Sequence, residues 1–117
     1  MNHILVAEDE RDVRSFLKDE LTDAGYRVTV VENGADAVLK ATEHSIDLFL
    51  LDMLMPGLDG IKTIQVLRKL VPETPIIGLT GYMGRGLMAK AAMHDVNCFS
   101  KPVDVELLLD EIEHVLD

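Results

Sequence analysis

Side chains that could carry out phosphoryl chemistry stand at the ends of four short apolar segments of the sequence. They are three carboxylates, one hydroxyl and one ammonium group, carried by Glu8, Asp9, Asp52, Thr80 and Lys101. Three carboxylates in one place repel one another unless a positive charge lies between them. Magnesium supplies that charge through oxygen ligands and commonly bridges carboxylates to phosphate. The combination therefore indicates a magnesium-dependent phosphoryl site.

Asp52 is the candidate nucleophile of that site. An aspartate can attack a phosphoryl group and form an acyl phosphate when its charge is neutralised. Asp52 follows the central apolar segment, whereas Glu8 and Asp9 could hold the ion from a neighbouring one. Lys101 offers a compact positive charge to a phosphoryl oxygen, and the Thr80 hydroxyl can donate a hydrogen bond to another. One cysteine and four scattered histidines provide no zinc spacing.

The apolar segments alternate with stretches of helical period, which is typical of βαβ units around a parallel sheet. Strands are predicted at residues 3–7, 27–31, 47–51, 75–79 and 97–100. Helices are predicted to begin near Arg11, Gly34, Leu58, Gly84 and Val103. Because an open α/β sheet binds ligands beyond the carboxyl ends of its strands, the polar residues would line one crevice. No linker or repeat divides the sequence, so residues 1–117 are expected to form one domain.

The charge balance indicates which partners the chain can bind. The 21 acidic and 11 basic residues give a formal net charge of −10, and no cluster of lysines or arginines stands out along the sequence, so we expect no direct nucleic-acid contact. The apolar runs are far shorter than the roughly 20 residues of a membrane helix, and the first one is too short for a signal peptide, so neither is expected. Cys98 is the single cysteine. It suits a reducing compartment, so the cytoplasm is the expected location.

The sequence resembles the receiver domains of two-component response regulators over its whole length. The resemblance is carried by the acidic pair at 8–9, the block at 52–60, Thr80-Gly81 and Lys101-Pro102. It implies a flavodoxin-like, doubly wound (βα)5 fold with a five-stranded parallel sheet in the order 2-1-3-4-5. It also implies a cis peptide bond between Lys101 and Pro102. Such a domain takes a phosphoryl group on Asp52 and assists its own phosphorylation and dephosphorylation without being a true enzyme.

The resemblance implies a bound magnesium ion as well. Its ligands would come from Glu8, Asp9, Asp52 and Leu54. Glu8 would act through a water molecule, and Leu54 through its backbone carbonyl. Glu10 is expected to remain a charge of the first helical turn, where an acid interacts favourably with the helix dipole.

A conformational switch is the third implied feature. In this family Thr80 would move toward the phosphoryl group, and an aromatic residue or histidine three positions before the lysine would follow it. Here that position holds Cys98, which is too small to fill the space. We therefore expect the change to be carried by the loop 80–86, whose glycines make it easy to remodel, with Tyr82 moving most.

The implied partners are a sensor histidine kinase or a histidine phosphotransfer protein, and a downstream protein target or an output domain outside this chain. A homodimer could form through the helix that begins near Gly84, the strand 97–100 and the helix that begins near Val103.

Three alternative functions are weighed, of which the first two are left open. A receiver relic used only for docking would not need the intact set of acids, threonine and lysine. A flavodoxin-like ligand-binding domain would need a glycine-rich phosphate loop, which the sequence does not resemble. A haloacid-dehalogenase-like phosphatase would need a second aspartate where the chain has Leu54.

Overall fold

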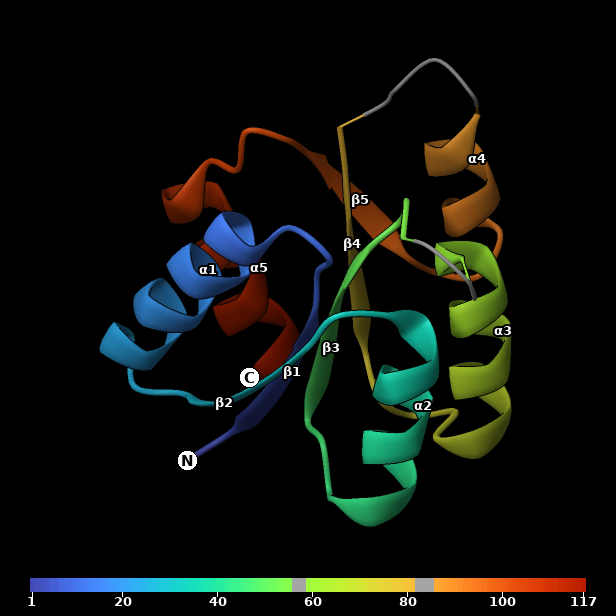
Figure 1. The fold of residues 1–117 in the computed structure, drawn as a ribbon, viewed down its shortest axis with the longest axis horizontal. Helices are drawn as coiled ribbons and strands as arrows, with labels where there is room; N and C mark the ends of the chain where they lie inside the picture. The colour runs from blue at the N-terminus through green and yellow to red at the C-terminus, as the bar shows by residue number, and fades with distance from the viewer. Residues whose placement is uncertain (56–58, 82–85) are drawn as a thin grey trace.

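The computed structural model describes residues 1–55, 59–81 and 86–117. Over these residues, strands and helices alternate along the chain as predicted (Figure 1). The strands are β1 (His3–Ala7), β2 (Arg27–Val31), β3 (Leu48–Asp52), β4 (Ile76–Thr80) and β5 (Asn97–Ser100). The helices are α1 (Arg11–Asp23), α2 (Gly34–Glu43), α3 (Gly60–Leu70), α4 (Leu87–Ala92) and α5 (Val105–Leu116).

The five strands form one parallel sheet in the order β2-β1-β3-β4-β5. This order confirms the predicted flavodoxin-like fold. The chain moves from β1 outward to β2 and then crosses to the other side of β1 to form β3. The order therefore reverses between β1 and β3, and their carboxyl ends are neighbours at the switch point.

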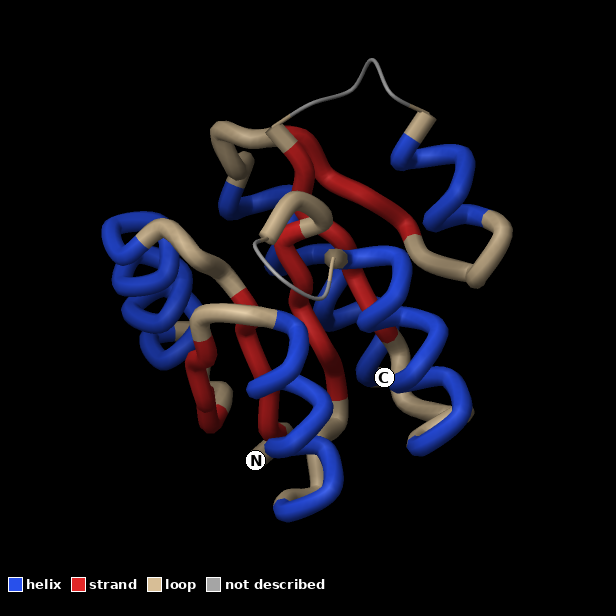
Figure 2. The backbone as a smooth tube through the Cα atoms, turned by 45° about the vertical axis from the view of Figure 1, so that its right-hand side comes forward, coloured by secondary structure: helices blue, strands red, loops and turns tan. Residues whose placement is uncertain are grey.

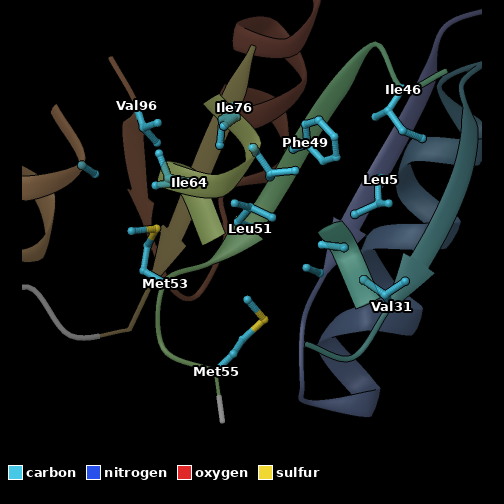
Figure 3. Packing of buried hydrophobic residues seen from close by; sticks show 14 residues of the cluster. Leu5, Val31, Ile46, Phe49, Leu51, Met53, Met55, Ile64, Ile76 and Val96 are labelled. Carbon is cyan, nitrogen blue, oxygen red and sulfur yellow. The ribbon is translucent and has the colours of Figure 1, made fainter. Parts of the chain in front are cut away.

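Helices cover both faces of the sheet. α1 and α5 lie on one face, and α2, α3 and α4 lie on the other (Figures 1 and 2). Successive strand residues point to opposite faces, so Leu5 and Phe49 belong to the core under α2 and α3, and Ile4 belongs to the core under α1 and α5. Figure 3 shows the first of these cores, with Leu51 and Ile64 packed between the sheet and α3.

Two strand boundaries lie one residue later than the side-chain pattern predicts. β3 and β4 end at Asp52 and Thr80, which were expected to follow the strands directly. The backbone pairing continues through both residues, because Asp52 is in register with Leu79 and Thr80 with Ser100. Polarity therefore marks where the apolar core ends, whereas the backbone ladder extends one residue further.

α3 and α5 each begin after an aspartate cap, and α5 begins later than predicted. The Asp59 side chain accepts a hydrogen bond from the backbone N–H of Lys62 at 2.9 Å, and Asp104 accepts one from Leu107 at 3.2 Å. The expected helix starts at residues 58 and 84 lie outside the described residues. No helix in the described part of the chain is long and apolar enough to cross a membrane.

Candidate functional site

The carboxyl ends of the strands bring charged side chains together around Lys101, which directly follows β5. The ammonium Nζ lies 2.6 Å from Glu8 Oε1, 3.1 Å from Asp52 Oδ2 and 3.5 Å from Glu10 Oε1. Glu8 and Lys101 are 93 positions apart in the sequence, so their contact depends on the sheet order. The peptide bond between Lys101 and Pro102 is cis, as the family resemblance implies.

Two of these carboxylates are buried. Glu8 is 0% exposed and Asp52 is 3% exposed, whereas Asp9 and Glu10 are open to solvent. Burying a carboxylate is costly unless it is paired and hydrogen-bonded. Lys101 satisfies one oxygen of Glu8, and among the described residues the second oxygen, Oε2, is buried without a hydrogen-bond partner. That oxygen lies where a further ligand could contact it.

Crowding of the acids changes their proton affinities. Burial, and after it the neighbouring Asp52 carboxylate, raises the pKa of Glu8 to about 8, although Lys101 opposes the shift. Burial and Asp52 also raise the pKa of Asp9. Burial would lower the pKa of Lys101, but its hydrogen bond to Glu8 and the charge of Asp52 outweigh that effect and raise it. One lysine is thus too little positive charge for this group of carboxylates.

The turn after β3 holds Asp52 in place. Its Oδ1 accepts a hydrogen bond from the backbone N–H of Leu54 at 3.1 Å, while its Oδ2 faces Lys101. The start of α3 packs tightly on this turn, because a Cβ at Gly60 would lie 2.6 Å from the Cα of Met53. Gly60 also donates its N–H to the Met53 carbonyl at 3.3 Å. Only glycine fits this backbone contact.

Thr80 and Cys98, the two predicted switch residues, lie on adjacent strands. Thr80 is buried at the end of β4, and its carbonyl accepts the backbone N–H of Lys101 at 2.9 Å. Cys98 is partly buried beside Gly78, where a Cβ would come within 2.7 Å of the Cys98 sulfur. Tyr82, expected to move most in the loop 80–86, lies outside the described residues. The switch roles stay predictions.

Three consecutive acids provide a donor set for a metal ion. Glu8, Asp9 and Glu10 each place one carboxylate oxygen within 4.8 Å of the others. An all-oxygen set of this kind suits magnesium. Leu54 lies beside the site, because its N–H contacts Asp52. The roles of the backbone carbonyl of Leu54 and of each acid as ligands stay predictions.

Glu10 is the site residue that sequence reasoning missed. It was expected to be a charge of the first helical turn, but it is the N-cap of α1, and its carboxylate lies 3.5 Å from Lys101. The available signal was its position next to the acidic pair. An acid at a helix start also interacts favourably with the helix dipole, and Glu10 was explained in that way instead.

Comparison with known proteins gives the family of the chain. The family model described as "Response regulator receiver domain" matches residues 4–113. The response regulator receiver protein CpdR of Brucella abortus (strain 2308) is 38% identical over 117 residues, which cover 99% of this chain and 98% of the relative. The response regulator ArlR of Staphylococcus aureus is 34% identical over 119 residues, and the chain spans only 53% of its length.

Solved structures agree with this result. The response regulator TrrA of Thermotoga maritima, solved in complex with Mg²⁺ and BeF, is 32% identical with a TM-score of 0.90, covering 99% of this chain and 100% of that one. The chemotaxis protein CheY4 of Vibrio cholerae is 27% identical with a TM-score of 0.91, covering 99% of both chains. The chain therefore belongs to the response regulator receiver domain family, a signalling module of two-component systems rather than a classical enzyme.

Proposed function

We propose that this receiver domain accepts a phosphoryl group on Asp52 from a sensor histidine kinase or a histidine phosphotransfer protein. The observation that carries the proposal is the position of Asp52. It is buried at the end of β3, between the Lys101 ammonium and the Leu54 N–H, and beside the exposed Asp9. A carboxylate held in this way is oriented for attack on a phosphorus atom.

The surrounding residues take complementary roles in the proposed reaction. An Asp52 oxygen forms the new bond to phosphorus while the bond to the donor's leaving group breaks, which gives an acyl phosphate. Lys101 neutralises charge on a phosphoryl oxygen, and the Thr80 hydroxyl donates a hydrogen bond to another. Hydrolysis by water returns the free carboxylate.

A divalent cation fits the acidic site. The buried Glu8 Oε2 lacks a hydrogen-bond partner among the described residues, and three carboxylate oxygens lie close together. Asp9, Asp52 and the Leu54 carbonyl would hold magnesium directly, with Glu8 acting through water. When bound, magnesium would supply the positive charge that the phosphoryl oxygens need. The relative TrrA was solved with Mg²⁺ and BeF, which supports this choice of metal.

Labelling with acetyl phosphate and magnesium tests the phosphoacceptor. Intact-mass spectrometry should detect one added phosphoryl group on the wild-type chain and none on Asp52→Asn. The matched control is Asp59→Asn, because Asp59 caps α3 and asparagine caps helices equally well; this variant should be labelled normally. Labelling of Asp52→Asn at the wild-type rate would remove Asp52 from the proposal. An unlabelled wild-type chain would favour the docking-only receiver.

Titration calorimetry tests the metal ligands. Asp9→Asn should weaken magnesium binding more than Glu10→Gln, because Asp9 is the proposed direct ligand and Glu10 is not. Both side chains are exposed acids in the same cluster, so each variant is the control for the other. Equal losses would assign the ion to the acidic cluster as a whole.

The biological setting extends the same proposal. The chain would work in the cytoplasm, with a kinase upstream and a protein target or an output domain outside residues 1–117. A homodimer would use α4, β5 and α5. Phosphotransfer profiling against the sensor kinases of the host tests the first partner, and sedimentation with and without beryllofluoride tests the dimer.

A further inference from the structure

A groove runs between α3 and α4, beside the phosphoryl site. Two adjoining hollows of about 300 and 490 Å³ share Gln65 on α3. The first is also lined by Leu54, Lys62 and Lys90, and the second by Lys69 and His94. α3 and α4 lie on the same face of the sheet (Figures 1 and 2), where α3 contacts α2 and α4 contacts β5. We call the two hollows together the α3–α4 groove.

The groove is basic although the chain is strongly acidic. Among the described residues, its lining includes Lys62, Arg68, Lys69 and Lys90 but only one acid, Asp59, whereas the whole chain has a net charge of −10. Within the described residues, none of the three lysines is in an ion pair. Their charges are therefore available to a partner.

Favourable interaction with a helix dipole explains only some of these positive charges. Arg68 lies in the last turn of α3, where a cation interacts favourably with the helix dipole, and it donates hydrogen bonds to the carbonyls of Thr74 and His94. Lys62 lies in the first turn of the same helix, where a positive charge is unfavourable. Lys62 therefore has no stabilising role within α3 that would account for its charge.

The same groove has an apolar end. Leu54 is 45% exposed, although it is a large aliphatic residue, and it lines the hollow together with Met53 and Ile61. We infer that the α3–α4 groove is a docking surface for an acidic peptide segment of a partner protein. Carboxylates of the segment would pair with Lys62 and Lys90, and an apolar side chain would cover Leu54.

Other occupants fit the charges less well. A second copy could offer α5, which carries several acids and no lysine or arginine. That contact would join different surfaces of two highly acidic chains and would not close into a symmetric dimer. A nucleic acid would meet the overall net charge of −10. A short acidic segment carries few charges and can reach the groove's lysines without bringing a second large acidic surface against the chain.

Binding of a fluorescein-labelled peptide of alternating glutamate and leucine, followed by anisotropy, tests the inference. The unphosphorylated chain is used, so the result does not depend on the role of Asp52. The peptide should bind, bind less at high salt, and shift the backbone amide NMR signals of α3 and α4. A peptide with glutamine in place of glutamate should bind more weakly.

Charge reversal locates the site. The double variant Lys62→Glu, Lys90→Glu should bind the acidic peptide about tenfold more weakly or worse, while its labelling by acetyl phosphate stays normal. The control Lys18→Glu, Lys40→Glu makes the same change in net charge on α1 and α2 and should bind like the wild type. No binding by the wild-type chain, or equal losses in the two double variants, would overturn the inference. So would self-association or DNA binding that only the Lys62 and Lys90 reversal abolishes.

Discussion

A buried polar residue lies at the start of β1 and another directly after its last residue. Their hydrogen bonding differs. At the start, His3 is 5% exposed, and its Nε2 lies 2.6 Å from the Thr29 hydroxyl. The backbone N–H of His3 donates to Asp47 Oδ2 at 2.7 Å, and the Asp47 N–H donates back to the His3 carbonyl at 2.8 Å. Just past the other end, Glu8 is fully buried, with one oxygen on Lys101 and the other without a hydrogen-bond partner in residues 1–55, 59–81 and 86–117.

The difference separates a polar group bonded within the sheet from one to which we assign a proposed metal-binding role. Buried polar groups in proteins are normally hydrogen-bonded, and the contacts of His3 meet that rule with neighbouring strand residues. Within the described part of the chain, one oxygen of Glu8 departs from that rule, at the place where several acids meet a single lysine. This departure supports the proposed metal site at the carboxyl end of the sheet. Burial alone would not have distinguished the two residues.

The largest effect should come from removing the Lys101 ammonium group, which contacts Glu8 just past the end of β1. Lys101→Met should lower the free energy of unfolding by about 3 kcal/mol in metal-free buffer, because Glu8 and Asp52 lose their partner. Urea denaturation at pH 8 measures this loss. Adding Glu8→Gln to the same chain should recover part of it.

The matching change at the other end is Thr29→Val, which removes the hydroxyl next to the His3 ring. It should cost only about 1 kcal/mol, the usual value for one neutral hydrogen bond. A larger loss from Thr29→Val than from Lys101→Met would contradict the contrast between the two ends.

The next effect concerns the turn that holds Asp52. Gly60→Ala should lower the free energy of unfolding by about 2 kcal/mol, because the new Cβ would press on the backbone of Met53. The control is Gly81→Ala, where a Cβ would make an ordinary contact at 3.9 Å with Lys101. Urea denaturation should find the control within the error of the wild type. Equal stability of the two variants would show that the backbone of the turn can move to accommodate the added Cβ at little cost.

The two ends should also respond oppositely to pH. Glu8 has a folded-state pKa raised from 4.5 to about 8, so the folded state binds more protons between these values and metal-free stability falls as pH rises through them. We expect a change on the order of 1 kcal/mol, because Asp9 and Glu10 leave the site open to solvent screening. Urea midpoints across this range measure it, and Glu8→Gln should flatten the slope.

His3 gives the opposite slope. Burial, with the nearby Arg27 charge, lowers its pKa below 6.5. The unfolded state then binds more protons between the lowered value and 6.5, so stability is complete above 6.5 and is lost as pH falls. His3→Asn should remove this acid-side loss and leave the slope above pH 7 unchanged. Slopes of the same sign for both residues would refute the assignment.

The smallest effect is expected at Cys98, on the edge strand. Cys98→Ala should change the free energy of unfolding by less than about 1 kcal/mol, because the side chain is only partly buried. It should also leave the response to beryllofluoride nearly unchanged, since this small residue cannot take the place of the family's aromatic residue. Amide hydrogen exchange with and without beryllofluoride measures both the change in stability and the response to this phosphoryl mimic. A strand-five response that the variant abolishes would instead give Cys98 a part in the switch.

Much of the fold could be predicted from the sequence because its signals are local. Alternation of apolar strands with amphipathic helices depends on neighbouring residues, so strand number, helix number and sheet type follow from it. The polar strand endings also predicted which residues meet, and the structure brings Glu8, Asp52 and Lys101 into contact. The chemical roles of these residues stay predictions that the labelling and calorimetry experiments test.

Tertiary structure alone decided which charged groups of the site are paired and how tightly the surrounding backbone packs. Strand pairing set the last residues of β3 and β4, and the packing of α3 on the turn after Asp52 determined that only glycine fits at position 60. The lysine that reaches Glu8 across 93 residues, and the Glu8 oxygen that it leaves unpaired, depend on distances in the folded chain. Hydrogen bonding and burial are properties of the three-dimensional surroundings, whereas residue type and spacing are properties of the chain. The sequence therefore determined which groups converge, and only the fold decided which of them lack a partner.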